Sequence, residues 1–79
     1  MSALRQGEDF WDAGNMGCGE LVLKLRKHLK SMPGGLMRVV AHDPGAIHDI
    51  PAFCRMTRNS LEHYDAATHT FWIRSRLDW

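Results

Sequence analysis

The 79-residue sequence lacks the features that mark membrane, secreted and zinc-binding proteins. No apolar run approaches the ~20 residues of a membrane-spanning helix, and residues 1–8 lack the apolar core of a secretory signal. The two cysteines do not form a Cys-x-x-Cys motif, the usual spacing of zinc and redox sites. We therefore expect a cytoplasmic protein with no membrane partner, whose cysteines are thiols rather than a structural disulfide.

An excess of charge of either sign is also missing. Ten Lys and Arg residues against nine Asp and Glu give a net charge of +1, so no overall field favours nucleic acid or a membrane. No aromatic residues interleave with the basic ones along the chain, and we expect no direct nucleic-acid binding. Length and composition predict a single domain over residues 9–76, between a flexible N-terminus at 1–8 and a C-terminal tail at 77–79.

The first half of the chain predicts a strand, a helix and a second strand. Residues 9–13 form a strand candidate that a Gly-Asn turn closes. A helix is expected over residues 19–32 because apolar residues recur there at helical spacing. Its apolar stripe comprises Val22, Leu25, Leu29 and Met32, widened by Leu21. Residues 36–42 are apolar nearly throughout and predict a central strand.

The second half predicts one more helix and two strands. Residues 43–46 are interpreted as a loop, or as the first turn of a broken helix capped by its aspartate. Asp49 is the expected N-cap of the next helix, with Pro51 in its first turn. The apolar face of that helix carries Ile50, Phe53, Cys54 and Thr57. Residues 60–67 and 68–74 predict two strands joined by a turn.

The predicted order of elements is βαβαββ, which belongs to the α+β class. A strand, a helix and a strand within about 35 residues imply a right-handed crossover and a parallel strand pair. We therefore predict a two-layer α/β sandwich, in which both helices cover one face of a four-stranded mixed sheet.

The residue best placed for chemistry is Cys18, which lies between two glycines directly ahead of the first predicted helix. Gly17 and Gly19 remove side-chain bulk on both sides of the sulfur. The helix N-terminus offers unpaired N–H groups and the positive end of the helix dipole, which lower the pKa of a cysteine. Cys18 is therefore the candidate nucleophile, with an inert thiol as the alternative.

Three further residues are expected to surround this thiol. Glu20 complements the helix dipole. His42 and Asp43 follow the central strand, where they emerge near the start of a helix, and His42 is a candidate for tuning the thiol. The alternative for His42 is an ordinary polar residue at a strand end.

Lysine and arginine side chains gather on one side of the first helix, at Lys24, Arg26, Lys27 and Lys30. This basic side is either a solvated surface or a docking surface for acidic patches on partner proteins. In the second case the predicted docking residues are Glu20, Leu23, Arg26, Lys27 and Lys30.

The remaining cysteine and the histidines favour structural roles. Cys54 lies on the predicted apolar face and is interpreted as a core thiol, with a resolving cysteine for Cys18 as the alternative. None of the five histidines forms an i, i+4 pair on one helix or has a cysteine at ligand spacing. We therefore expect no metal site.

The segment from Asp43 to Cys54 reads Asp-Pro-Gly-Ala-Ile-His-Asp-Ile-Pro-Ala-Phe-Cys and carries a family resemblance. It is similar to the Asp-Pro…Asp-Ile-Pro-x-Phe-Cys segment of the bacterial TusA/SirA-like sulfur carriers, at the same spacing from the upstream cysteine. Asp12, Gly34 and the Leu-Arg-Lys at residues 25–27 also match the family pattern. The resemblance covers residues 11–74, nearly the whole predicted domain.

The family's Cys-Pro-x-Pro hallmark is Cys-Gly-Glu-Leu here, with Gly19 and Leu21 in place of the prolines. The resemblance implies that Cys18 carries sulfur as a persulfide, without a bound cofactor. It also implies a donor protein, a cysteine desulfurase or a rhodanese-like protein, and an acceptor sulfurtransferase. The implied pathways are tRNA thiolation, molybdenum-cofactor metabolism and oxidative sulfur metabolism. A binding module that keeps the fold without transferring sulfur is the alternative, and the missing prolines motivate it.

Overall fold

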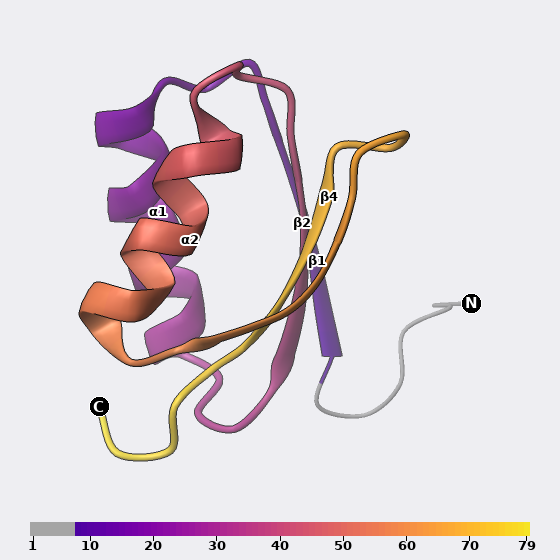
Figure 1. The fold of residues 1–79 in the computed structure, drawn as a ribbon. Coiled ribbons are helices and arrows are strands. Elements are labelled where there is room, and N and C mark those ends of the chain that lie inside the picture. The colour runs from indigo at the N-terminus through magenta and orange to yellow at the C-terminus, as the bar shows by residue number, and fades with distance from the viewer. Residues whose placement is uncertain (1–7) are drawn as a thin grey trace.

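Six elements form the domain in the predicted βαβαββ order (Figure 1). A computed structural model describes residues 8–79, including the side chains of residues 9–79 except that of Cys18. The predicted flexible N-terminus therefore lies outside the described residues, apart from Glu8, which begins the first strand. The elements are β1 (Glu8–Gly14), α1 (Cys18–Lys30), β2 (Leu36–Ala41), α2 (Ala46–Thr57), β3 (Ser60–Asp65) and β4 (Thr70–Arg74).

The four strands form one mixed sheet in the order β1-β2-β4-β3. β1 and β2 pair in parallel, whereas β4 pairs antiparallel with both β2 and β3. The two helices lie together on one face of the sheet, and no helix of residues 8–79 lies over the other face (Figure 1). The predicted two-layer sandwich with a parallel first pair and a central β2 is thus confirmed.

A bulge in β3 explains why its apolar residues do not alternate. Leu61 pairs with Ile73 and Tyr64 pairs with Phe71, although the two β3 residues are three apart. The register shift between Leu61 and His63 takes up the extra residue, so both apolar side chains reach the face that the helices cover.

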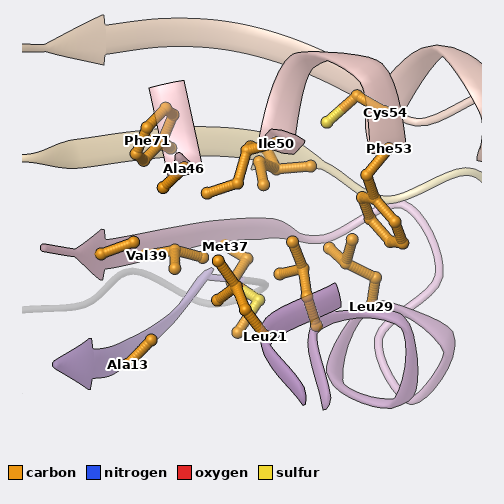
Figure 2. Packing of buried hydrophobic residues seen from close by; sticks show 13 residues of the cluster. Ala13, Leu21, Leu29, Met37, Val39, Ala46, Ile50, Phe53, Cys54 and Phe71 are labelled. Atoms are coloured by element: carbon orange, nitrogen blue, oxygen red, sulfur yellow. The ribbon is translucent and has the colours of Figure 1, made fainter. Parts of the chain in front are cut away.

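The core lies between the sheet and the two helices (Figure 2). α1 contributes Leu21, Leu25 and Leu29, all fully buried, whereas Val22 and Met32 are only partly buried. Leu21, predicted only to widen the stripe, is therefore one of its fully buried members, whereas Val22 and Met32 lie at its edge, because the face that meets the sheet repeats every four residues. The other large buried side chains include Met37 and Val39 of β2, Ile50 and Phe53 of α2, and Phe71 and Ile73 of β4.

α2 begins earlier than the sequence predicts. Its N-cap is Gly45, and its first residue, Ala46, is buried on the same face as Ile50. The carboxylate of Asp43 accepts the N–H of Gly45 at 3.0 Å, so a turn at this aspartate leads directly into the helix. The prediction of Asp49 as N-cap is wrong, because packing of Ala46 extends the helix upstream of it.

The same extension places Pro51 inside α2 rather than in its first turn. A proline there cannot donate the usual hydrogen bond to the carbonyl four residues earlier, which belongs to Ile47. At the other end, Arg58 adopts a left-handed conformation with φ 60°, and the N–H of Asn59 donates to the Cys54 carbonyl at 3.0 Å. α2 therefore ends in the type of turn that commonly closes helices.

The C-terminal residues are bonded to the domain. Ser75 is buried, and its hydroxyl donates to the Leu29 carbonyl of α1 at 2.6 Å. The Trp79 indole N–H in turn donates to the Ser75 hydroxyl at 2.9 Å, and its partly buried ring packs against the core. Trp79 thus contributes to the packing of α1 on the sheet.

Candidate functional site

The candidate nucleophile is the first residue of α1, where the chain turns from β1 into the helix. Gly14 ends β1 in a left-handed conformation with φ 58°. Gly17 is the N-cap in an extended conformation, and its carbonyl accepts the N–H of Leu21 at 2.8 Å, the first hydrogen bond of the helix. Cys18 therefore begins α1, as the sequence predicts.

No described side chain caps this end of α1. The first N–H groups of a helix have no acceptor within it, so these donors remain available to another acceptor. Glu20, in the first turn, is exposed and forms an ion pair with Lys24 at 3.8 Å. The helix start therefore combines unpaired N–H donors with the positive end of the dipole, which is favourable for an anion.

The two glycines beside Cys18 lie in open surroundings. Both are exposed, and a Cβ atom built on Gly17 or on Gly19 meets no heavy atom within 4 Å. Neither adopts a positive φ angle, so no backbone strain requires glycine at either position. The open space leaves room for a partner to approach this end of α1.

A second loop, between β2 and α2, lies at the same end of the molecule (Figure 1). The N–H of His42 donates to the Gly14 carbonyl at 2.8 Å and joins this loop to the one before α1. Its imidazole lies against that of His69, with ring centroids 4.9 Å apart, and the Asp43 carboxylate bonds to Gly45. The predicted neighbours of the thiol thus come from adjoining loops, but the described contacts of both side chains are to other residues.

The predicted docking residues all project from α1 into solvent. Leu23 is 56% exposed, and Arg26, Lys27 and Lys30 are exposed as well. Gly19, Leu23, Arg26 and Lys30 follow one another at spacings of four, three and four residues, so they share one face of α1. This exposed face begins one residue after Cys18.

A groove between α1 and α2 is a feature that the sequence analysis missed. It encloses about 260 Å³ between Val22 of α1 and residues of α2 that include Phe53 and Met56. The Met56 side chain is 85% exposed, which is unusual for a large apolar residue. The predicted helix already contained Met56 one turn beyond Ala52, but the packing of α1 beside them depends on the tertiary structure and has no local sequence signal.

A second cavity of about 300 Å³ lies at the end of the molecule where the two loops meet. His42 and Asp43 line one side, Tyr64 and His69 line another, and Ile47 of α2 closes it. Its histidines are far apart in the sequence, which is why sequence patterns did not group them. Within the described part of the chain, no three His, Cys, Asp or Glu side chains are grouped so as to hold a metal ion.

Cys54 is buried in the core of the domain, where Figure 2 shows it on α2 close to Ile50 and Phe53. Burial raises the pKa of its thiol from 9.0 to about 11, although the charge of Arg55 partly opposes this shift. A buried thiol with a raised pKa stays protonated near neutral pH and is a poor nucleophile. These properties support the predicted structural role of Cys54.

The fold and this site define a small α/β domain that presents a cysteine at an open, uncapped helix start. The family model described as Sulfurtransferase TusA matches residues 10–75, and the chain belongs to this family. The chain is 39% identical over 70 residues to the sulfur carrier protein TusA of Pseudomonas putida strain F1, covering 85% of this chain and 88% of the relative. A protein of the same name from Pseudomonas aeruginosa strain LESB58 is 37% identical over 70 residues, covering 85% and 89%. The resemblance seen in the sequence is therefore confirmed.

None of the helices in the described part of the chain is long and apolar enough to cross a membrane.

Proposed function

We propose that this protein is a sulfur carrier and that Cys18 accepts a persulfide sulfur from one protein and delivers it to another. The observation that carries the proposal is the position of Cys18 at the open, uncapped start of α1 in a chain of the TusA family. A thiolate at this point gains from the unpaired N–H groups and the helix dipole. Relatives named sulfur carrier protein TusA support the same role.

The transfer needs no net oxidation or reduction. The Cys18 thiolate attacks the terminal sulfur of a donor persulfide, a new sulfur–sulfur bond forms, and the donor's own sulfur leaves as a thiolate. Delivery repeats the step with Cys18 as the leaving thiolate and a cysteine of the acceptor as the nucleophile. A cysteine desulfurase or a rhodanese-like protein would supply the sulfur, and an acceptor sulfurtransferase would take it to tRNA thiolation, cofactor synthesis or sulfur oxidation.

Intact mass after incubation with a persulfide donor tests the proposal. The wild-type chain and Cys54→Ala are expected to gain one sulfur atom, whereas Cys18→Ala is expected to gain none. Loading of Cys18→Ala, or no loading of the wild-type chain by desulfurase and rhodanese-type donors, would contradict carriage. The second outcome would favour the binding module without sulfur transfer that the missing motif prolines suggest.

The exposed face of α1 is the proposed docking surface for the partners. Arg26 and Lys30 lie on it with Leu23, next to the groove that Val22 lines, so a partner with an acidic patch and an apolar contact residue would fit. Lys27 and Glu20 extend the surface on the neighbouring side. A partner docked here has its own reactive sulfur close to the start of α1.

Charge reversal on α1 tests whether its exposed face is a docking surface or only a solvated surface. Arg26→Glu is expected to slow sulfur loading at low salt, since electrostatic attraction mainly affects the rate of association. Arg55→Glu makes the same change of charge at an exposed arginine of α2 and serves as the control. Equal loading rates for Arg26→Glu and the wild-type chain would assign this face to solvent.

A further inference from the structure

The face of the sheet opposite the helices carries a row of four residues, one from each strand. Met37 and Val39 of β2 are buried toward the helices, so Arg38 between them points to the other face. Phe10 of β1 pairs with Arg38, Arg38 pairs with Trp72 of β4, and Trp72 pairs with His63 of β3. We call Phe10, Arg38, Trp72 and His63 the cross-strand row.

Members of the cross-strand row stack on one another, with Phe10 and His63 exposed and Arg38 and Trp72 half-buried between them. The guanidinium carbon of Arg38 lies 5.1 Å from the centre of the Phe10 ring, and the His63 and Trp72 ring centroids are 5.0 Å apart. Phe10 is 44% exposed, and the Arg38 Nε atom is buried with no hydrogen-bond partner among the described residues. Aromatic residues and arginine are the types enriched in protein–protein interfaces.

Carboxylates around the row argue against a polyanion on this face. Asp12 and Asp65 lie on the same side of the sheet, and the charge of Arg74 is taken up by its ion pair with Glu62 at 3.0 Å. Arg38 is thus the one lysine or arginine of this face without a carboxylate within ion-pair distance, among the residues whose side chains are described. A nucleic acid would meet more negative than positive charge here.

We propose that this open face binds a second copy of the chain, through a two-fold axis that runs along the strands between β2 and β4. This axis reverses the strand order β1-β2-β4-β3. It therefore places Arg38 over Trp72 of the second copy, and Phe10 over His63 of the second copy. Each dimer gains two cation–π contacts, because a two-fold interface uses the same patch twice.

The cross-strand row favours this axis over the alternative. A two-fold axis perpendicular to the strands would keep the order of the row and bring the two Arg38 side chains together, where like charges repel. Both axes keep the strands of the two sheets near the aligned packing that twisted sheets adopt, so the charges decide between them. Charge complementarity thus selects one arrangement of the two copies.

The expected association is weak and leaves the helices free. Four strands about 4.8 Å apart and about five residues long give a face of roughly 19 by 17 Å, which is small for a specific interface. α1 and α2 lie on the opposite face of the sheet (Figure 1), so a dimer of this kind leaves both copies of Cys18 accessible. The proposal does not depend on sulfur carriage.

Sedimentation velocity over a range of concentrations tests the dimer. The wild-type chain is expected to associate reversibly, and Arg38→Ala or Trp72→Ala is expected to raise the dissociation constant at least about tenfold. Met56→Ala, at an exposed residue on the helix side, is the control and should leave the dissociation constant unchanged. Circular dichroism shows which variants fold, and Phe10→Ala replaces Trp72→Ala if the latter unfolds.

Cross-linking tests whether the cross-strand row of the second copy runs in the opposite order, so that Phe10 lies over His63. In a Cys18→Ser background, the double variant Phe10→Cys and His63→Cys is expected to form covalent dimers with a short bismaleimide. Each single variant should form few, since three strand spacings alone separate equivalent positions by about 14 Å, and the distance between the two sheets adds to this. Three results would overturn the proposal. The chain could stay monomeric at all concentrations up to about 1 mM, or its dimer could be unaffected by Arg38→Ala and Phe10→Ala. It could also bind an oligonucleotide in a way that Arg38→Ala abolishes.

Discussion

Two glycines at the ends of the loop before α1 allow a sharp test of how the backbone sets the stability of this region. Gly19 is the second residue of α1 and is exposed, whereas Gly14 ends β1 with φ 58°. A Cβ atom added at either position meets no heavy atom within 4 Å. Substitution by alanine therefore changes the conformational preference of the backbone without causing a clash at either site.

The expected effects on the free energy of unfolding have opposite signs. Gly19→Ala should stabilise the domain by about 0.5–1 kcal/mol, because alanine loses less backbone entropy in a helix than glycine does. Gly14→Ala should destabilise it by about 1–2 kcal/mol, because a left-handed conformation brings Cβ close to the following carbonyl. For a domain of this size, each 1 kcal/mol shifts the melting temperature by about 4–8 °C.

Thermal unfolding followed by circular dichroism, together with urea titration, measures both variants. Amide hydrogen exchange at residues 17–21 adds a local measurement, since we expect these amides to exchange faster than those in the middle of α1 and to slow in Gly19→Ala. Changes of the same sign in the two variants would refute the backbone argument. Exchange at residues 17–21 as slow as in the helix interior would show that the glycines do not loosen this loop.

Two further predictions concern buried polar groups. The raised pKa of Cys54 means that the folded state binds its proton more tightly than the unfolded state, so the stabilisation present below pH 9 should be lost as the pH rises toward about 11. Urea unfolding should show this loss in the wild-type chain relative to Cys54→Ala, and parallel pH profiles would contradict the burial argument. Ser75→Ala should lower the free energy of unfolding by about 1–3 kcal/mol, because Trp79 Nε1 and the Leu29 carbonyl lose their hydrogen bonds to the Ser75 hydroxyl. Ser31→Ala, an exposed control, should change the free energy of unfolding by less than about 0.5 kcal/mol in the same titration.

The order of elements and the position of Cys18 could be predicted because they depend on local patterns. Apolar residues at helical spacing mark α1, a run of apolar residues marks β2, and a glycine precedes the thiol. The start of α2 could not be predicted in the same way. Ala46 looks like a loop residue in the sequence, and only its burial against the sheet makes it the first residue of the helix.

Other features depend on contacts between distant residues, which no local pattern contains. Phe10, Arg38 and Trp72 are neighbours only because three strands align in a particular register. Aromatic residues do not lie between basic ones along the chain, but Phe10 and Trp72 flank Arg38 across the sheet. The meeting of His42 with His69 likewise requires the β3–β4 turn to lie beside the end of β2.

The uncapped start of α1 makes the stability of its first turn depend on whether an anion is present there. A serine or aspartate at the position of Gly17 would stabilise the helix by a few tenths of a kcal/mol, but its side chain would occupy the N–H groups beside Cys18. With glycine there, these N–H groups remain available to an anion at the start of the helix. If Cys18 carries sulfur as proposed, a persulfide anion there would accept hydrogen bonds from these N–H groups and stabilise the first turn of α1. The loaded and empty forms would then differ in stability as well as in chemistry. A partner could distinguish them by how well ordered the first turn is.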